Sequence, residues 1–590
     1  MAGERLSRLE PDLGRLANPD FLGAMAAPAA AAGLTLLFVI PTLAPTVGFW
    51  DTAEFQTVGP VLGTAHPTGY PSYVILGWLA SIALAPFGEP AYRMNLLQAI
   101  LAAGAVAAAT GLVQVLTGRR MIALATGLLL ACSQLFWRLS THADPHMYHI
   151  ALTALLFVVL MTWDNRRHSE DPETLSHADR WLVAAAGIYG VAVANHSLAI
   201  LLPPAIGLFV LAVDWRVVLR WRTIVTCVAV LAGTIVVLFL ELPVRAAMHA
   251  PLVYGHPDTV SGFQYVVLAE QFRGSLANPF SDLPTKAGHV MDLLTGWLGP
   301  MAVLAAIGLA TSLFRRPRYI LLSGLAAVVT CGFAASYANA DIERYYLLPL
   351  LIAFTWIGLG LADMVAAAGW AAGEWQRRYV PGRIGESSSG AEDNTAESNP
   401  ATAPAARDLH GNDSGWAGWA VLIGEMVVAA AVIFSTVGVI AQRQGPNAID
   451  NPGGVSEAAS TSYSIWMNAV LAPPDRGGLA QNAVIESTWS DSTILWYGQR
   501  ALGLRPDILI IDDSTRKNDR IGPSGEVWDI FDKYLGTRPV YTDRFQGGCD
   551  GIEALGTAFD LRKTSLSNIY EVVSRFEPRV DLRPCDPIKP

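Results

Sequence analysis

The chain has 590 residues, of which 52% are hydrophobic and only 15% are charged, and its mean hydropathy is +0.36. Soluble domains carry about 25% charged residues, so this composition excludes an ordinary soluble protein and indicates a membrane protein. A net charge of −10 without a basic patch gives no sign of nucleic acid as a partner, and five cysteines exclude a disulfide-rich scaffold.

The N-terminal residues 1–28 are predicted to be a cytoplasmic segment. They lack a short apolar core followed by a small-residue cleavage site, so the first apolar block is interpreted as an anchor rather than a removed signal peptide. Several apolar blocks approach or exceed the length that a helix needs to cross a bilayer core of about 30 Å. They are residues 29–43, 121–135, 223–240 and 416–440.

Lys and Arg gather in the cytoplasmic loops of membrane proteins. Six basic clusters lie at residues 5–15, 119–120, 166–180, 216–222, 315–318 and 377–383. Together with a final span at 416–441, they predict about eleven transmembrane helices, with a cytoplasmic N-terminus and an extracytoplasmic C-terminus.

Two apolar blocks need separate treatment. Residues 72–87 would reach only about 24 Å as a helix, so they are interpreted as a re-entrant or interfacial helix of the first outer loop. Residues 181–213 have basic clusters at both ends and must cross twice, with a break at the outer surface near Asn195 and His196.

Changes in composition along the sequence divide the chain into predicted domains. Residues 29–363 form a transmembrane module, residues 364–415 are expected to be a disordered cytoplasmic linker, and 416–441 is the last span. Residues 442–590 predict a small extracytoplasmic α/β domain, with strands near 483–485, 508–511 and 540–541. Cys549 and Cys585 could form a disulfide in that domain.

The first outer loop carries two acids, Asp51 and Glu54, which share a face if the loop is helical. Acidic groups at the mouth of a span are costly unless they are solvated or engaged. One interpretation is a general base with an orienting partner, and the other is an ordinary solvated loop. His66 and Tyr70 follow in a stretch rich in Gly and Pro, which indicates a close-packed loop.

The second outer loop contains His142, Asp144 and His146. These side chains could contact a sugar or phosphate, anchor the span ends, or bind a metal. Pro145 disfavours a regular helical turn between the two histidines, so metal binding is not the favoured interpretation.

Further polar residues occur at later outer loops. Arg245 closes a span and either snorkels or clamps a phosphate, with Asp258 shortly after it. Another span begins at Glu343, Arg344 and Tyr345. The neighbours Glu343 and Arg344 are either a surface ion pair or part of a site.

These groups lie outside, next to span ends, whereas a transporter tends to place ionisable groups in mid-span. The pattern therefore favours an active site that faces the outer surface. An aromatic and acidic group in the C-terminal segment could stack on a sugar or simply pack in a core. It consists of Trp489, Asp491, Trp496 and Tyr497.

Several of these residues form a pattern that resembles the transmembrane-protein-260-like family, also called glycosyltransferase family 117, of the GT-C superfamily. The pattern is strongest over residues 45–275. It comprises Asp51-x-x-Glu54-Phe55, His66-Pro67-x-Gly69-Tyr70-Pro71, Arg93-x-Asn95-Leu96, Asn195-His196, Leu242-Pro243-x-Arg245 and, later, Glu343-Arg344-Tyr345.

The resemblance implies a polytopic α-helical, GT-C-like membrane glycosyltransferase. It would take a sugar from a polyprenyl-phosphate carrier and pass it, with inversion, to a hydroxyl of a protein Ser or Thr, a glycan or a lipid. Asp51 would be the catalytic base and Glu54 the second family acid. Family members often have Glu in an Ala-Glu-Val-Tyr-like context where this chain has Ala143-Asp144-Pro145-His146.

The expected substrate-binding residues are His66, Tyr70, Arg93, His142, Asp144, His146, Asn195, His196, Arg245, Asp258, Glu343, Arg344 and Tyr345. No obligatory cofactor is expected and a divalent metal is not favoured; the expected location is a plasma membrane. A transporter or flippase of lipid-linked sugars and a non-catalytic membrane scaffold are the alternatives. The sugar and the acceptor are not determined.

Overall fold

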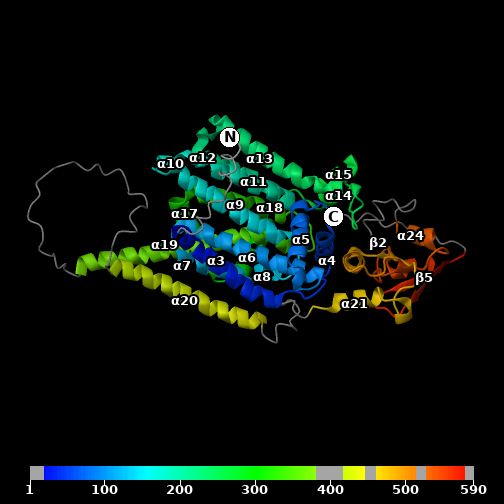
Figure 1. The fold of residues 1–590 in the computed structure, drawn as a ribbon. Coiled ribbons are helices and arrows are strands. Elements are labelled where there is room, and N and C mark those ends of the chain that lie inside the picture. Colours follow the sequence, from blue (N-terminus) through cyan, green and yellow to red (C-terminus); the bar gives the residue numbers. More distant parts are fainter. Residues whose placement is uncertain (1–18, 380–415, 445–459, 513–525, 578–581, 583–590) are drawn as a thin grey trace, which may run out of the picture.

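The computed structural model describes residues 19–379, 416–444, 460–512, 526–577 and 582. A large helical module, built of long helices that run side by side, is joined at one end by a smaller domain that contains the strands (Figure 1). The fold is therefore the predicted one, a polytopic α-helical module with a small α/β domain.

The long helices of the module carry most of its apolar sequence. They are α3 (Pro19–Val39), α6 (Pro90–Thr117), α7 (Arg120–Ala131), α9 (Pro145–Arg167), α11 (Asp179–Asn195), α12 (Pro203–Asp214), α13 (Trp221–Phe239), α16 (Leu283–Leu298), α17 (Met301–Arg315), α18 (Pro317–Ala334), α19 (Leu347–Tyr379) and α20 (Trp416–Gln444).

Shorter helices connect them. They are η1 (Ile40–Thr42), α4 (Asp51–Val61), α5 (Pro71–Ala83), η2 (Ala85–Phe87), α8 (Gln134–Leu139), α10 (Pro172–Ser176), η3 (Ser197–Leu201), η4 (Trp215–Leu219), α14 (Glu241–Ala247), α15 (Val260–Val267), η5 (Glu270–Ser275) and η6 (Ile342–Tyr346).

The described residues contain seven helices that are long and apolar enough to cross a membrane, or eight if the bent pair of α16 and α17 counts as one span. About eleven were expected. The other expected crossings fall on that pair, whose axes meet at 113°, and on α7, α11 and α12. These three have 12, 17 and 12 residues and are shorter than a typical span of about 20 residues.

Element boundaries also differ from expectation in places. Residues 364–379, expected in the linker, continue α19 as a helix, while 380–415 lie outside the described residues. The block 72–87 forms the short apolar helix α5 followed by η2, in keeping with its limited length. The break between α11 and α12 falls at Asn195 and His196 as predicted, but both residues are buried rather than at the surface.

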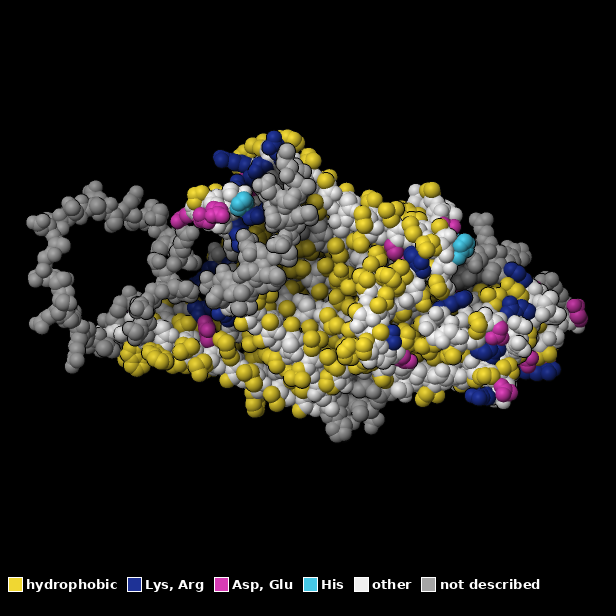
Figure 2. Space-filling view, in the orientation of Figure 1, with side chains coloured by type: hydrophobic (Ala, Val, Ile, Leu, Met, Phe, Trp, Pro, Cys, Tyr) yellow, Lys and Arg dark blue, Asp and Glu magenta, His cyan; other side chains and the backbone are white. Residues whose placement is uncertain are grey.

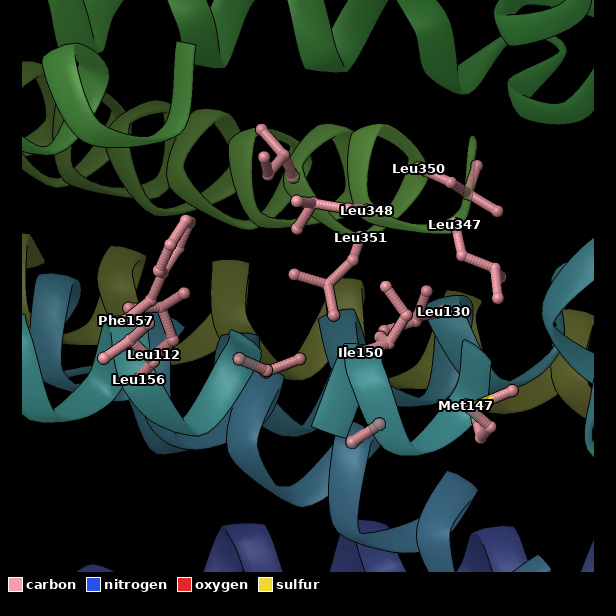
Figure 3. Close-up of a cluster of buried hydrophobic side chains, with 14 of the residues drawn as sticks. Leu112, Leu130, Met147, Ile150, Leu156, Phe157, Leu347, Leu348, Leu350 and Leu351 are labelled. Carbon is pink, nitrogen blue, oxygen red and sulfur yellow. The ribbon is translucent and has the colours of Figure 1, made fainter. Parts of the chain in front are cut away.

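The core of the module lies between α6, α7, α9 and α19. Leucine, isoleucine and phenylalanine side chains from these four helices interdigitate there, among them Leu112, Leu130, Phe157 and Leu351 (Figure 3). α17 and α19 cross closely because both present glycine: a Cβ on Gly308 would lie 1.8 Å from a backbone oxygen of α19.

The surface of the module has the distribution of a membrane protein. Hydrophobic side chains cover its middle, and charged ones gather at the two ends (Figure 2). α13 and α20 are largely exposed although they are among the most apolar helices, which suits contact with lipid. Ion pairs tie helix ends of the predicted cytoplasmic side together: Arg167–Asp214, Arg220–Asp179, Arg315–Asp363, Arg316–Asp363, Arg318–Asp164 and Arg119–Glu425.

The C-terminal domain is built on a five-stranded mixed sheet of order β2-β1-β3-β5-β4. β1 is parallel to β2 and β3, and the β3–β5 and β5–β4 pairs are antiparallel. The strands are β1 (Val484–Ser487), β2 (Leu509–Asp512), β3 (Val540–Thr542), β4 (Phe559–Lys563) and β5 (Tyr570–Arg575). The helical elements are α21 (Ser462–Val470), η8 (Pro474–Arg476), α22 (Trp489–Trp496), η9 (Tyr497–Ala501), α24 (Val527–Tyr534) and α25 (Ile552–Leu555).

The three predicted strands are confirmed as β1, β2 and β3, whereas β4 and β5 were not predicted. Cys549 is disulfide-bonded. Cys585 lies outside the described residues, so its pairing with Cys549 stays a prediction.

The domain docks on the helical module through apolar contacts. Val47, Ala53 and Ala91 of the module share one buried cluster with side chains of α21, α22 and η9. The Tyr497 hydroxyl of η9 accepts a hydrogen bond of 3.0 Å from the Ala91 amide, in the first turn of α6. This docking places the start of α22 over the start of α4.

Candidate active site

A cavity of about 1300 Å³ lies where the helix ends meet the C-terminal domain. Both parts of the chain line it. Its walls include nine of the residues predicted from the sequence: Asp51, His66, Tyr70, His142, Asp144, His146, His196, Arg344 and Tyr345. The sequence-based prediction of one site assembled from several outer loops therefore matches the geometry.

The centre of the cavity wall is a chain of alternating charges, Asp51–Arg344–Asp144. Arg344 Nη2 donates to Asp51 Oδ2 at 2.9 Å, and Arg344 Nη1 donates to Asp144 Oδ2 at 3.2 Å. Asp51 begins α4, Asp144 is the N-cap of α9 and Arg344 lies in η6, so three distant segments converge here. All three side chains are less than one-fifth exposed, which makes each charge depend on the others.

Both carboxylates are held in the ionised form. Burial opposes ionisation of Asp51, but the nearby charges of His66 and Arg344 outweigh it and hold its pKa below the ordinary value. Burial likewise opposes ionisation of Asp144, and His146 and Arg344 outweigh it, so its pKa is also lowered. Asp144 Oδ1 accepts from both the backbone N and the Nδ1 of His146, at 2.7 and 2.8 Å.

Glu54 has a different position from Asp51, although both lie on the first turn of α4. Its side chain is 1% exposed, does not line the cavity, and binds His66 through Nδ1 and through the backbone amide, the latter at 2.7 Å. The other ring nitrogen of His66, Nε2, faces the Tyr70 hydroxyl at 3.2 Å. Glu54 thus orients a histidine of the cavity wall instead of facing the cavity itself.

Glu54 and His66 form a buried, hydrogen-bonded pair. Burial raises the pKa of Glu54 more than the charge of His66 lowers it. Burial alone would lower the pKa of His66, but the carboxylates of Glu54 and Asp51 outweigh it and raise that pKa above its ordinary value. His66 therefore stays protonated to a higher pH than a free histidine.

Replacing Glu54 by Gln is expected to lower the pKa of His66, because the largest raising charge is removed while burial persists. The measurement is a pH titration of the His66 imidazole by NMR, assigned with His66→Gln. Glu343→Gln is the matched control, because Glu343 lies outside the cavity and binds Arg138 instead. An unchanged His66 titration in Glu54→Gln would contradict the assigned pair.

His146 and His196 form a second histidine group, with ring centroids 4.4 Å apart. His146 Nδ1 faces the Asp144 carboxylate and so carries a proton, whereas His196 Nδ1 accepts from the Leu198 amide at 3.1 Å. In the neutral His196 ring this leaves Nε2 as a donor. Neither His146 Nε2 nor His196 Nε2 has a hydrogen-bond partner although both are buried. Two such nitrogens side by side can bind a polar group of a ligand.

Three of the predicted substrate-binding residues hold loops in place through hydrogen bonds to backbone carbonyls. Arg93 donates to the carbonyls of Gly88 and Ser81, at 2.7 and 3.1 Å, and so fixes the connection between α5 and α6. Asn195 donates to the Pro145 carbonyl at 3.0 Å. Arg245 donates to the carbonyls of residues 61 and 62 at the end of α4. None of the three lines the cavity.

Two further predicted residues also lie outside the cavity lining. Asp258 is exposed to solvent after α14. Glu343 accepts from Arg138 at 2.8 Å, with both side chains more than one-third exposed. The expected surface ion pair of Glu343 with its neighbour Arg344 is therefore not formed; Glu343 pairs with Arg138 instead, and such exposed pairs contribute little to stability.

Several cavity residues were not predicted as site residues. Gln271 and Arg273 of η5, Tyr337 and Asn339 before η6, and Tyr463 of α21 all line it. Trp489, which the sequence analysis considered only as a side chain that could stack on a sugar or pack in a core, lines it too, and its Nε1 donates to Asp51 Oδ1 at 3.1 Å. The polar run at 271–273 beside a span end was the available signal for η5, but no sequence pattern links Trp489 to a loop 438 residues away.

Within the described ranges, no group of three or more His, Cys, Asp or Glu side chains is arranged to hold a metal ion. His142 and His146, considered as metal ligands from the sequence, both line the cavity, but His146 is engaged by Asp144.

Residues 51–219 match the family model described as the protein O-mannosyl-transferase TMEM260 N-terminal domain. That segment is similar to the TMEM260 family. Mouse protein O-mannosyl-transferase TMEM260 is 27% identical over 343 residues, which are 54% of this chain. The chain spans about half the length of that relative, since the match covers 46% of it. The resemblance to the TMEM260-like family is thus confirmed.

Solved structures show the same architecture. ArnT from Cupriavidus metallidurans, bound to undecaprenyl phosphate, superposes with a TM-score of 0.54 at 14% identity, over 94% of this chain and 99% of ArnT. The apo oligosaccharyltransferase of Archaeoglobus fulgidus gives a TM-score of 0.50 at 13% identity, over 88% and 70% of the two chains. The fold is therefore that of the GT-C membrane glycosyltransferases, and the TMEM260-like segment contributes Asp51, Asp144 and most of the histidines of the cavity.

Proposed function

We propose that this chain is a membrane glycosyltransferase that moves a sugar from a polyprenyl-phosphate carrier to a hydroxyl acceptor on the extracytoplasmic face. One observation carries the proposal: in a GT-C fold, the ionised carboxylate of Asp51 lies on the wall of a large cavity at the helix ends. Trp489 and Arg344 occupy one lone pair on each oxygen of this carboxylate, which leaves the others for an incoming hydroxyl.

Asp51 is the general base in this reaction. The acceptor oxygen attacks the anomeric carbon, the bond from that carbon to the phosphate oxygen breaks, and its electron pair leaves with the lipid phosphate. The acceptor proton passes to Asp51. A carboxylate of low pKa can take this proton because the hydroxyl becomes acidic as its oxygen bonds to carbon. One base and one displacement invert the configuration at the sugar.

The leaving lipid phosphate needs positive charge more than a proton. Arg344 and Arg273 line the cavity, whereas Arg245, the other cation considered from the sequence, is turned to backbone carbonyls. Arg344 is shared by two carboxylates, and Arg273 is more than half exposed beside Glu270. Arg273 is therefore the residue that we assign to the phosphate, with Arg344 holding Asp51 in place.

The donor and acceptor classes follow from the relatives. The ArnT structure contains undecaprenyl phosphate, which supports a polyprenyl-phosphate donor. The mouse relative is named a protein O-mannosyl-transferase, which supports mannose as the sugar and a protein Ser or Thr as the acceptor. Two buried ring nitrogens without partners, at His146 and His196, suit a hydroxyl-rich ligand.

The placement in the membrane rests on charge. The basic clusters that the structure describes, at 119–120, 166–180, 216–222 and 315–318, gather at the side that the positive-inside rule assigns to the cytoplasm, and none of these four supplies a residue to the cavity. The cavity, the C-terminal domain and the C-terminus then lie on the extracytoplasmic side of a plasma membrane, and the N-terminus lies in the cytoplasm. Nucleotide sugars are absent there, so the donor is lipid-linked. We propose that no metal is obligatory, and full activity in EDTA is the corresponding test.

The test is sugar transfer by the purified full-length protein in nanodiscs, with radiolabelled polyprenyl-phosphate sugars and a Ser/Thr-rich acceptor peptide. Consumption of polyprenyl-phosphate mannose with labelling of the peptide is the expected result. If no donor in the panel is consumed with peptide, glycan or lipid acceptors, the proposed function is wrong. Movement of an intact lipid-linked sugar across the bilayer without transfer would favour the flippase alternative.

A further inference from the structure

Asp51, at the first position of α4, receives a hydrogen bond from the other end of the chain. Trp489 Nε1, on the first residue of α22, donates to Asp51 Oδ1 at 3.1 Å. Arg344 Nη2 donates to the other oxygen, Oδ2, at 2.9 Å. The two donors together fix the plane of the carboxylate, because each oxygen has its own partner. Without Trp489, the described structure leaves Asp51 anchored only on the Arg344 side.

The position of Trp489 is itself closely determined. It follows β1 directly, at the carboxyl end of a strand flanked by two parallel neighbours, where α/β domains commonly present functional side chains. The buried carboxylate of Asp543 holds the turn, because it accepts from the Ser487 hydroxyl at 2.5 Å and from the Thr488 amide at 3.1 Å. The backbone that carries Trp489 is therefore fixed from inside the sheet.

The indole ring is enclosed by aromatic rings from both parts of the chain. It meets His66 and Tyr254 of the helical module edge-on, with centroids 5.8 and 5.9 Å away, and Trp496 of its own domain at 5.7 Å. These edge contacts leave the N–H in the plane of the ring free to point at Asp51. Trp496 and Tyr497, grouped with Trp489 in the sequence, pack in the docking interface instead.

The docking interface holds Trp489 in a fixed position relative to the helical module. Ala53, two residues after Asp51 in α4, is fully buried in the same cluster as Ile494, Trp496 and Tyr497. The Tyr497 hydroxyl is bonded to the Ala91 amide. Any shift of the C-terminal domain would move the Trp489 N–H relative to Asp51.

We infer that Trp489 is a positioning residue of the active site, supplied by the C-terminal domain, and that docking of this domain completes the catalytic carboxylate. The inference rests on the proposed function, because it assigns a role to Asp51 in sugar transfer. It gives the domain a task beyond capping the helices: it orients the base, and it does so through one N–H group.

The activity test compares Trp489→Phe with wild type in the nanodisc transfer assay. We expect kcat to fall about 10- to 100-fold, in line with the loss of one hydrogen bond to a charged group, while KM for the lipid donor changes less than about twofold. The acidic limb of the pH–rate profile should move to higher pH, because a donor that lowers the pKa of Asp51 is lost. A purely structural tryptophan would not move that limb.

Trp466→Phe is the matched control. It also removes a hydrogen bond donated by an indole N–H in the C-terminal domain. That hydrogen bond, from Trp466 Nε1 to the Ser567 carbonyl, is 3.2 Å long, and Trp466 does not line the cavity. We expect wild-type kcat and an unmoved pH profile. If Trp489→Phe folds poorly, benzothienylalanine at position 489 keeps the shape of the ring while sulfur replaces the N–H. Wild-type kcat and pH profile in either position-489 variant would overturn the inference.

A measurement without any donor separates this inference from the proposed function. The full-length protein is labelled with 5-fluorotryptophan, and the resonance of position 489 is assigned by its loss in Trp489→Phe. In Asp51→Asn this ¹⁹F resonance should shift, and that of position 466 should not. An unshifted position-489 resonance would overturn the inference, whereas a shift in a protein that transfers no sugar would reject only the proposed function.

Discussion

Asp51→Asn should reduce sugar transfer by about 10²- to 10⁴-fold, the range that one general base contributes. The asparagine side chain retains an oxygen for Trp489 or Arg344 but cannot take the acceptor proton. The base takes the acceptor proton only in the chemical step. The fall should therefore lie in kcat, and donor binding should persist. Single-turnover transfer from a radiolabelled polyprenyl-phosphate sugar, beside a donor-binding measurement, checks both statements.

Asp258→Asn provides the control for this loss. The sequence pattern placed Asp258 among the substrate-binding residues, but its side chain is exposed and outside the cavity lining. We expect transfer within about twofold of wild type. Equal activity of Asp51→Asn and wild type would show that Asp51 is not the base, and the proton would then have to pass to another cavity group such as Asp144.

The sequence predicted those parts of the site that local pattern determines. Asp51 and Glu54 follow a span end, and Asp144 precedes Pro145, which begins α9 as the first helical residue. Such features depend on charge, proline and apolar length within a few residues, and the structure places both loops at one cavity. The break at Asn195 was predicted for the same reason, since basic clusters at both ends required two crossings.

Roles that depend on tertiary packing could not be predicted in this way. Glu54 and Asp51 are three residues apart and look equivalent in sequence, yet Glu54 turns to His66 and only Asp51 faces the cavity. Arg93 and Arg245 also match the family pattern, yet both tie loops to backbone carbonyls and neither lines the cavity. A pattern of residue types does not distinguish a structural arginine from one that meets a substrate.

The same limit applies to the fold. The predicted strands β1, β2 and β3 are short apolar runs, whereas Phe559–Lys563 and Tyr570–Arg575 include several charged residues and pair at the edge of the sheet. α7 and α12 were expected as spans because of flanking charge, and their length of only 12 residues was not predicted, because charge does not determine helix length. Length is set by the breaks at Ser133 and Trp215, where α8 and η4 follow.

Arg344→Met should both destabilise the protein and abolish transfer. It leaves Asp51 and Asp144 as buried carboxylates without their shared cation, and breaking a buried ion pair in this way costs about 3–5 kcal/mol. Arg344→Lys should not restore activity, because one ammonium group cannot hold two carboxylates in the geometry of the planar guanidinium. Thermal unfolding in detergent measures the loss of stability, and the transfer assay measures the loss of activity. Arg138→Met, which breaks an exposed ion pair, is the control and should change neither stability nor activity markedly.

The double variant Arg344→Met, Asp144→Asn separates charge balance from catalysis. Removing one of the two unpaired carboxylates relieves part of their repulsion, so the double variant should unfold at a higher temperature than Arg344→Met alone. Transfer should stay low, because Asp51 has still lost the donor to Oδ2 that, with Trp489, holds it towards the acceptor. Recovery of both stability and transfer would mean that Arg344 only neutralises charge, and its geometric role would then be rejected.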